Sequence, residues 1–281
     1  MGLTVDFELS MPKYRFSVLL PIYHRENPDY FRSALDSIKA QTLQADEIVI
    51  VKDGELPVEL DQVIEEFTDV LPIKIISIPI NVGLGEALNI GINACSFELV
   101  ARMDSDDVSV PERFEQQIAT FSKDPQLDIS GSFLQEFENE PADLKVIRRV
   151  PLKHSAIYSY TFHRCPFNHP TVMFRKDAVL KAGSYMKMPF FEDYYLWIRM
   201  ALAGCRMNNS SQVLLHYRIG NNMISRRHGI KYAKHELSFF KFCYKKSLIS
   251  LPQLALFSLR FPLRLIPIGM LEKFYTILLR K

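Results

Sequence analysis

FSVLLPIYHRENPDYFRSALDSIKAQTLQADEIVIVKDG, residues 16–54, is the stretch that decides the fold of this 281-residue chain. It opens with an apolar run at 16–23 and closes with another at 47–54, both rich in Val and Ile as buried strands are. The residues between them, 28–41, repeat apolar side chains at helical spacing, namely Phe31, Leu35 and Ile38. The stretch therefore predicts a strand, a helix and a second strand.

The same alternation continues as far as residue 104. Two further apolar runs, IKIISIPI at 73–80 and LVARMD at 99–104, alternate with helix-like segments at 58–68 and 84–94. Repeated strand–helix units of this kind predict an α/β fold with a doubly wound, mostly parallel sheet. Ligands of such sheets bind at the carboxyl ends of the strands, so we expect the functional site there.

The second half of the chain is less regular. We expect strands at 128–138 and 212–220. Helices are expected at 154–163 and 191–204, and TVMFRKDAVLKAG (171–183) predicts a strand that runs into a helix. The expected inner face of the helix at 191–204 carries Leu196, Met200 and Ala203.

The charge of the chain is unevenly distributed. A hydrophobic fraction of 48% and a charged fraction of 23% fit a globular protein, and the formal net charge is only +2. Residues 223–281, however, carry twelve Lys and Arg against two acidic residues, so this tail is near +10 and the rest of the chain near −8. A basic, apolar tail on an acidic body predicts contact with an anionic surface. Nucleic acid is a poor candidate, because no nucleic-acid-binding motif accompanies the basic residues.

The tail begins with the pattern of an amphipathic helix. Its apolar positions are Ile230, Ala233, Leu237, Phe240 and Tyr244, and another face carries Lys231, Lys234, Lys241 and Lys245. Residues 251–281 are apolar but interrupted by prolines and arginines, which favours lying in a membrane interface over spanning a membrane. Two other interpretations remain open: the tail packs on the rest of the chain as core, or it supports a dimer.

The sequence also indicates the compartment. The four cysteines lie far apart without a CxxC pair, which predicts neither a zinc site nor a disulfide framework. The first residues contain acids and no apolar signal-peptide core, and no stretch reaches the ~18 uncharged apolar residues of a membrane span. We therefore expect a cytoplasmic protein that is peripheral on the inner face of the cell membrane.

The acidic cluster DSDD at 104–107 follows directly on an apolar run. Carboxylates at the end of a buried strand repel one another, and Mg²⁺ or Mn²⁺ would relieve that repulsion while binding diphosphate oxygens. In the alternative interpretation, Asp107 or Ser109 caps a helix that starts near Pro111.

Several motifs in a fixed order resemble glycosyltransferase family 2, over about residues 16–220. They are SVLLPIYHRE, EIVIVKDG, NVGLGEALNIGI, VARMDSDD and FEDYYLWIR. NHPTVMFRKDAVLKAGSY and HYRIGNNMISRRHG resemble the branch that builds bacterial capsule, exopolysaccharide and O-antigen repeats. The resemblance implies a GT-A catalytic domain over 14–222. The charge and amphipathic pattern described above predict that 223–281 is a basic, membrane-associating helical segment.

The resemblance also implies the reaction. An inverting hexosyltransferase would move galactose or glucose from a UDP-sugar, with Mn²⁺ or Mg²⁺, to a polyprenyl-diphosphate-linked N-acetylhexosamine. Two rival functions fit the sequence less well. A sugar-phosphate nucleotidyltransferase would need a Gly-rich phosphate loop after the first strand, which PIYHREN does not offer. A non-catalytic membrane-associated assembly protein would not need the acidic residues of the motifs.

The resemblance assigns roles to individual residues. The donor site would include Pro21, Tyr23, Glu26, Asp53, Asn81, Gly83 and Gly85. Asp53 would hydrogen-bond the uracil, although Lys52 and Glu55 replace the flanking residues of the family's usual Asp-Asp-Gly-Ser. Asp104 would face the ribose and the metal, and Asp106 would ligate the metal.

Asp193 would be the catalytic base, because inverting transfer needs a group that accepts the proton of the acceptor hydroxyl. A carboxylate at a helix N-terminus stays ionised in the field of the helix dipole. Its neighbour Glu192 is a candidate for contacting the acceptor or the diphosphate. The alternative is that Glu192 and Asp193 only cap their helix.

The remaining candidates each have two interpretations. Arg102 pairs with an Asp or reaches the donor, His169 contacts the acceptor or is structural, and Trp197 is core or an acceptor platform. Phe190 and Phe191 are candidates for the floor of the acceptor cleft. Residues that would grip a diphosphate, or else lie solvated at the surface, are Arg218, Arg226, Arg227 and His228.

Overall fold

The computed structural model describes residues 14–143, 146–219, 229–259 and 261–265. Within them one mixed sheet has the strand order β3-β2-β1-β4-β8-β6-β9-β5, with β7 paired to β6. The strands are β1 (Phe16–Tyr23), β2 (Glu47–Asp53), β3 (Ile73–Ile78), β4 (Leu99–Arg102), β5 (Val108–Ser109), β6 (Ile129–Phe137), β7 (Ile147–Arg148), β8 (Met173–Arg175) and β9 (Met207–Arg218).

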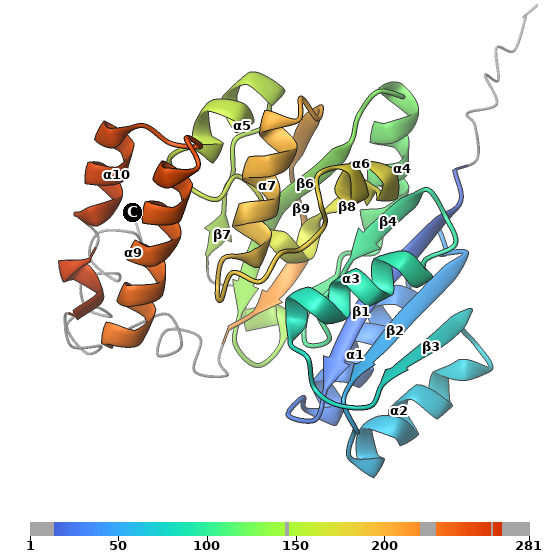
Figure 1. Ribbon diagram of the computed structural model, residues 1–281. Coiled ribbons are helices and arrows are strands. Elements are labelled where there is room, and N and C mark those ends of the chain that lie inside the picture. Colours follow the sequence, from blue (N-terminus) through green and yellow to red (C-terminus); the bar gives the residue numbers. More distant parts are fainter. Residues whose placement is uncertain (1–13, 144–145, 220–228, 260, 266–281) are drawn as a thin grey trace, which may run out of the picture.

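Helices connect and cover these strands (Figure 1). They are α1 (Pro28–Lys39), α2 (Val58–Thr68), α3 (Leu84–Ala94), α4 (Arg113–Lys123), α5 (His154–Thr161), α6 (Lys176–Lys181), α7 (Glu192–Leu202), α9 (Gly229–Lys245) and α10 (Leu251–Ser258). Short 3₁₀ helices include η1 (Pro141–Asp143), η2 (His169–Thr171) and η3 (Pro262–Leu265).

The first four strands form the parallel part of the sheet that the sequence predicts. β1 pairs in parallel with β2 and β4, and β2 with β3. Beyond β4 the sheet becomes mixed, because β8 runs antiparallel to both β4 and β6. Between β4 and β8 the chain forms β5, α4, β6, β7, α5 and η2, so the two strands are not joined by the single helical crossover typical of parallel neighbours.

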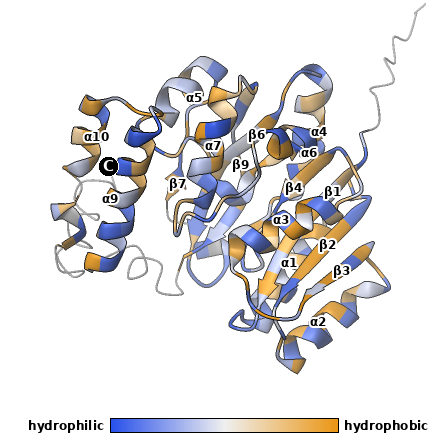
Figure 2. Cartoon of the chain, viewed as in Figure 1, coloured by the Kyte–Doolittle hydropathy of each residue, from blue (hydrophilic) through white to orange (hydrophobic). Residues whose placement is uncertain are grey.

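Helices cover both faces of the sheet. Buried side chains of α1, α2 and α4 pack on one face with Val18 and Leu20 of β1. On the other face α3, α6 and α7 pack with Leu19. Because neighbouring strand residues point to opposite faces, a strand covered on both sides must be apolar almost throughout. Figure 2 accordingly shows β1 and β2 mostly in the hydrophobic colour.

The helices largely follow the predicted pattern. The side chain of Asn27 accepts hydrogen bonds from two backbone N–H groups of the first turn, so α1 begins directly after it. The inner face of α7 carries Leu196 and Met200, both fully buried. The prediction for Ala203 is wrong, because α7 ends at Leu202 and Ala203 is exposed beyond it.

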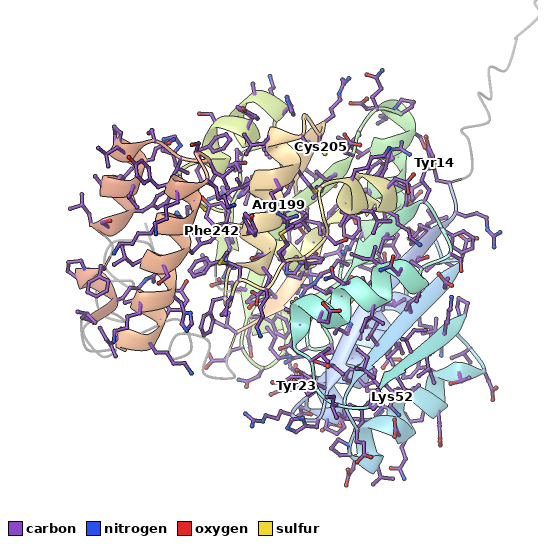
Figure 3. The ribbon with its side chains drawn as sticks, in the orientation of Figure 1. Tyr14, Tyr23, Lys52, Arg199, Cys205 and Phe242 are labelled. Atoms are coloured by element: carbon purple, nitrogen blue, oxygen red, sulfur yellow. The ribbon has the colours of Figure 1, made fainter. Side chains whose placement is uncertain are left out.

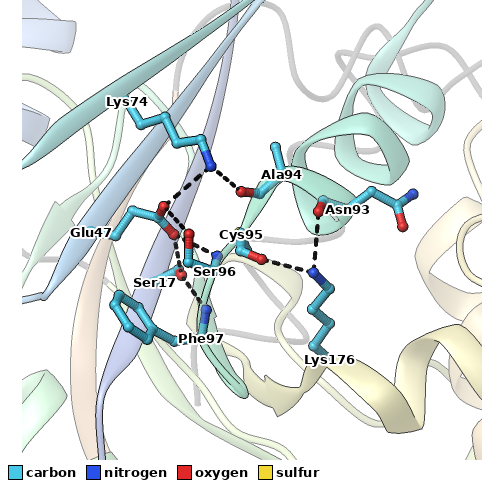
Figure 4. Close-up of polar contacts among 9 residues, drawn as sticks. All are labelled: Ser17, Glu47, Lys74, Asn93, Ala94, Cys95, Ser96, Phe97 and Lys176. Carbon is cyan, nitrogen blue, oxygen red and sulfur yellow. Dashed lines mark hydrogen bonds and ion pairs between the residues drawn. The ribbon is translucent and has the colours of Figure 1, made fainter.

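Two lysines hold the C-terminal end of α3 (Figure 4). Lys74 Nζ donates to the carbonyl oxygen of Ala94 at 2.5 Å. Lys176 Nζ donates to those of Asn93 at 3.2 Å and Cys95 at 2.7 Å. Cations satisfy the free carbonyls of a helix C-terminus and interact favourably with its dipole. This end of α3 is thereby fixed, and its other end faces the carboxyl ends of the strands.

The first part of the tail shares a core with the rest of the chain. α9 lies between α7 and α10 (Figure 1), and the three helices contribute to one hydrophobic cluster. Phe239 of α9 stacks on Phe191, with 4.8 Å between ring centroids. Phe257 of α10 stacks on Phe240 at 3.6 Å. The described part of the tail thus packs on the rest of the chain through aromatic rings.

The buried stripe of α9 differs from the predicted one. It comprises Tyr232, Ala233, Glu236, Phe239, Phe240 and Cys243. Ile230 and Tyr244, expected on that face, are 51% and 41% exposed, because the side of α9 that packs against α7 carries Tyr232, Phe239 and Phe240 instead. The four predicted lysines are exposed. Among the described helices, none combines the length and the apolarity that crossing a membrane requires.

Candidate active site

The site opens where β1 extends beyond β4. Pairing between these strands ends at Leu19 and Arg102, whereas β1 stays paired with β2 as far as Tyr23. Pro21 lies in this one-sided segment, where a residue without a backbone N–H costs no hydrogen bond to β4. Figure 3 shows Tyr23 and Lys52 at the same end of the sheet. The carboxyl ends of β1, β2 and β4 thus border one space.

Asp53 anchors the loop that leads into α3. Its two carboxylate oxygens accept hydrogen bonds from the backbone N–H groups of Val82 at 2.7 Å and Gly83 at 3.0 Å. The side chain of Asn81 donates to the carbonyl oxygen of Asp53 at 3.1 Å. Gly83 has φ +90°, a conformation that favours glycine, and directly precedes α3. The residues expected around the nucleotide are therefore brought together, with Asp53 in a structural role that the sequence did not predict.

Three aspartates meet after β4. Asp104, Asp106 and Asp107 each offer one oxygen within 4.8 Å of the others. Both terminal nitrogens of Arg102 donate to the carboxylate of Asp104. Asp107 is fully buried, and its Oδ1 accepts the backbone N–H of Arg218 at 3.0 Å. Its Oδ2 has no hydrogen-bond partner.

The electrostatics of this triad fit a divalent cation. Burial and the charge of Asp104 raise the pKa of Asp106 to about 6. Burial, Asp104 and Asp106 raise the pKa of Asp107 well above its usual value. A divalent cation would offset this repulsion and give the orphaned oxygen of Asp107 a partner, and carboxylates are ligands that Mg²⁺ and Mn²⁺ prefer. The capping interpretation of Asp107 is wrong, because α4 begins at Arg113 with Glu112 at its N-cap.

Arg113 is a part of the site that the sequence analysis missed. It is fully buried and donates to the carbonyl oxygen of Arg102 at 2.6 Å and to Ser109 Oγ at 3.1 Å. Burial lowers its pKa to about 9, with Asp107 opposing the shift. Two buried guanidinium groups therefore lie under the acidic triad. From sequence alone, an Arg in the first turn of a helix is expected to be exposed to solvent. No local pattern therefore predicted that Arg113 is buried.

Asp193 lies across the opening, at the start of α7. Its Oδ1 accepts the backbone N–H of Tyr194 at 2.7 Å, and its side chain remains 27% exposed. Its Oδ2 is 4.0 Å from Nδ1 of His169. The neighbouring Glu192 packs so close to Gly85 that a Cβ there would lie 3.2 Å from Glu192 Cγ. The N-termini of α3 and α7 therefore meet at this point.

Tyr185 links the two groups of carboxylates. It is buried, and its hydroxyl lies 2.9 Å from Nε2 of His169. Burial raises the pKa of Tyr185, and the charges of Asp193 and Asp104 raise it further. Burial and the nearby Arg102 lower the pKa of His169 well below its usual value, so this imidazole is neutral. The described part of the chain thus assembles the predicted base, the acidic triad and His169 around one centre.

Other predicted residues take structural positions. Trp197 is fully buried, so its assignment as an acceptor platform is wrong. Phe191 is a core residue stacked on α9 rather than the floor of a cleft, whereas Phe190 is 45% exposed. Arg218 is mostly buried, and its Nε donates to the carbonyl oxygen of Asp106 at 3.0 Å. It therefore holds the backbone of the segment that carries the three aspartates. Arg226, Arg227 and His228 lie outside the described residues.

A comparison with protein families agrees with this fold. Residues 17–183 match the model of glycosyl transferase family 2, and the chain belongs to that family. The chain is therefore a glycosyltransferase, and its mixed, mostly parallel sheet is of the GT-A type, as the sequence predicted.

Three curated relatives cover most of the chain. An uncharacterized glycosyltransferase of Haemophilus influenzae is 43% identical over 95% of this chain and 100% of its own length. The UDP-Gal:alpha-D-GlcNAc-diphosphoundecaprenol beta-1,3-galactosyltransferase of Escherichia coli is 39% identical over 84% of this chain and 86% of its own. The amylovoran biosynthesis glycosyltransferase AmsE of Erwinia amylovora is 39% identical over 80% and 84%.

Two solved structures share the fold at low sequence identity. The mannosyltransferase PcManGT of Pyrobaculum calidifontis, in complex with GDP-Man and Mn²⁺, has a TM-score of 0.64 and 16% identity, covering 89% of this chain and 71% of that one. Residues 1–349 of S. aureus TarS, in complex with UDP-GlcNAc, have a TM-score of 0.62 and 18% identity over 80% of this chain. This chain spans 65% of the TarS fragment.

Proposed function

We propose that the chain transfers galactose or glucose from a UDP-sugar to an N-acetylhexosamine carried on a polyprenyl diphosphate, with inversion at the anomeric carbon. The observation that carries the proposal is the pair of carboxylate groups facing one opening: the triad of Asp104, Asp106 and Asp107, and the separate Asp193. The name of the Escherichia coli relative supports the donor and the acceptor.

Asp193 is the proposed base. Its carboxylate would accept the proton of the acceptor hydroxyl as that oxygen attacks C1 from the face opposite the nucleotide. The side chain is 27% exposed, so an acceptor can reach it, and its position in the first turn of α7 favours the ionised form. A single base on the acceptor side is what inversion requires.

The donor would lie along the carboxyl ends of β1 and β2 and the start of α3. Its uridine would contact Pro21, Tyr23, Glu26, Asp53, Asn81 and Gly83. Asp106 and Asp107, with Asp104 held by Arg102, would bind Mn²⁺ or Mg²⁺. When bound, this ion supplies positive charge against the developing charge of the leaving diphosphate. α3 begins directly after Gly83, and the N-terminus of a helix favours anions.

The two rival functions fit the site less well. A nucleotidyltransferase is disfavoured by the family to which the chain belongs. A non-catalytic assembly protein would gain nothing from Asp107, because a buried carboxylate oxygen without a partner costs stability unless a ligand completes it. The orphaned oxygen therefore favours an enzyme.

We also propose that the enzyme is peripheral on a membrane and that 223–281 provides the contact. The outer side of α10 and η3 exposes leucines, and the neighbouring end of α9 exposes lysines. The exposed leucines are Leu251 (60%), Leu256 (49%), Leu259 (71%) and Leu265 (46%). Apolar side chains flanked by cations suit an anionic lipid surface. Co-sedimentation with phosphatidylglycerol vesicles should fall for a Leu256→Ser/Leu259→Ser variant, and unchanged binding would exclude this face.

The reaction is tested with a panel of donors. Purified enzyme is incubated with Mn²⁺, a synthetic GlcNAc-diphosphate lipid, and in turn UDP-Gal, UDP-Glc, UDP-GalNAc, UDP-GlcNAc or GDP-Man. UDP-Gal or UDP-Glc should give product, and proton NMR of that product should show a β-linkage. Asp193→Asn should lower kcat by roughly 10²–10⁴-fold while leaving UDP binding intact. Near-normal turnover of Asp193→Asn, or an α-linked product, would refute the mechanism.

A further inference from the structure

His169 lies between a hydroxyl and a carboxylate. Its Nε2 is 2.9 Å from the hydroxyl oxygen of Tyr185, and its Nδ1 is 4.0 Å from Oδ2 of Asp193. The first distance is a hydrogen bond, and the second is longer than a hydrogen bond. Catalytic hydrogen bonds are often long without substrate and tighten in the reacting complex. The imidazole is therefore placed to bridge Tyr185 and Asp193.

The charges around His169 determine which ring nitrogen carries the proton. A neutral imidazole has one N–H and one lone pair. If Nδ1 carried the lone pair, that lone pair would face the negative charge of Asp193 and be repelled by it. If Nδ1 carries the N–H, the N–H can donate to Asp193. Nε2 then accepts the proton of the Tyr185 hydroxyl, which burial keeps protonated by raising the pKa of Tyr185. The bridge has one favoured direction, from Tyr185 through His169 to Asp193.

The far end of this bridge is held rigidly. Asn89 of α3 makes two hydrogen bonds with the backbone of Tyr185: its Nδ2 donates to the carbonyl oxygen at 2.7 Å, and its Oδ1 accepts the N–H at 2.9 Å. The ring of His169 also contacts that of Trp197, with 6.0 Å between centroids. His169 thus has little freedom to turn away from Asp193.

We propose that His169 is a positioning residue for Asp193: a neutral imidazole, oriented by Tyr185, donates its Nδ1–H to Oδ2 and aims the carboxylate at the acceptor hydroxyl. This inference rests on the proposed role of Asp193 as base. Neutrality matters, because a cation at this position would lower the pKa of the carboxylate by about 1–3 units and weaken the base. Burial and Arg102 keep the imidazole neutral. A neutral donor therefore orients the base without weakening it.

Two substitutions of His169 test the roles of its two ring nitrogens separately. Asparagine places its amide near the position of Nδ1 and can still donate to Asp193, whereas glutamine places its amide near Nε2 and keeps only the contact with Tyr185. With UDP-Gal and the GlcNAc-diphosphate lipid, His169→Asn should retain kcat within about threefold. His169→Gln should lose about 10- to 100-fold in kcat with KM little changed, the range seen when an outer hydrogen-bond partner of a metal ligand is removed. A space-filling role predicts the reverse order, because glutamine is closer to histidine in size.

A double substitution tests whether His169 acts through Asp193. In the Asp193→Asn background, His169→Gln should change kcat by less than about twofold, because the group that it positions is gone. Equal kcat values for His169→Asn, His169→Gln and wild type would overturn the inference alone. Wild-type kcat in Asp193→Asn would instead refute the proposed base.

A spectroscopic measurement needs no substrate. The chain has seven histidines, and the signals of His169 in a ¹⁵N-histidine spectrum are those lost in His169→Asn. They should show the Nδ1–H tautomer, and Tyr185→Phe should shift them toward the Nε2–H tautomer. An Nε2–H tautomer in the wild-type protein would overturn the proposal, because a lone pair would then face Asp193.

Discussion

Phe239→Ala tests most directly whether the basic tail is part of the folded unit. Phe239 is fully buried, stacks on Phe191 at 4.8 Å and lies 5.5 Å from the ring of Tyr194. Truncating a fully buried Phe removes its contacts and leaves a cavity, which costs about 3–5 kcal/mol. Total stabilities are about 5–15 kcal/mol, so this loss is a large fraction of the whole.

The fluorescence of the single tryptophan, Trp197, reports this loss during urea unfolding, because Trp197 is buried in α7. The urea concentration at the midpoint of unfolding should fall. The slope m, by which the free energy of unfolding decreases with urea, should stay the same because the surface exposed on unfolding is little changed. Leu256→Ala is the matched control, because Leu256 is 49% exposed on α10 and its truncation should change stability by less than about 0.5 kcal/mol. An unchanged midpoint for Phe239→Ala would refute a shared core of α7 and α9.

Three further predictions concern the site and the sheet. Asp106→Ala removes one carboxylate of the triad, so the UDP affinity measured by calorimetry in the presence of Mn²⁺ should fall at least about tenfold. An unchanged affinity would exclude Asp106 as a metal ligand. Gly91→Ala should destabilise the protein by about 1–3 kcal/mol, because the new Cβ would lie 2.3 Å from Leu19 Cδ1, and an unchanged urea midpoint would contradict that packing. His169→Gln should lose less stability than wild type between pH 7 and 5. The folded-state pKa of His169 lies below the ordinary 6.5, so the unfolded chain binds the proton first and acid favours unfolding by at most about 1.4 kcal/mol per pH unit; equal losses would contradict a buried neutral imidazole.

The parallel half of the fold was predictable because its signals are local. The strands and helices from Phe16 to Arg102 repeat apolar residues at periods that depend only on neighbouring positions. The antiparallel β8 was predicted as a strand, but its direction depends on pairing with β4 and β6, which no local pattern records. The stripe of α9 was misjudged for a similar reason, because its aromatic partners on α7 lie far away in the sequence.

The site residues, like the strands and helices, differ in whether a local sequence pattern predicts them. Asp104, Asp106 and Asp193 were identified because they stand in contiguous motifs at element ends. The buried Arg113 was missed, and the meeting of His169 with Tyr185 was not foreseen, because each depends on elements that only the folded chain brings together. The short motifs therefore led to the groups proposed to do the chemistry but not to the buried groups that contact them.

Helix α3 connects these supporting groups. The loop before it is held by Asp53, and its C-terminal end by Lys74 and Lys176. Between these ends Asn89 fixes the backbone of Tyr185, whose hydroxyl reaches His169. One rigid element thus carries the loop proposed to bind the nucleotide and the residue that orients the proposed base. We therefore expect a displacement of α3 to change the distance between the proposed nucleotide site and the proposed base, because hydrogen bonds connect this helix to both.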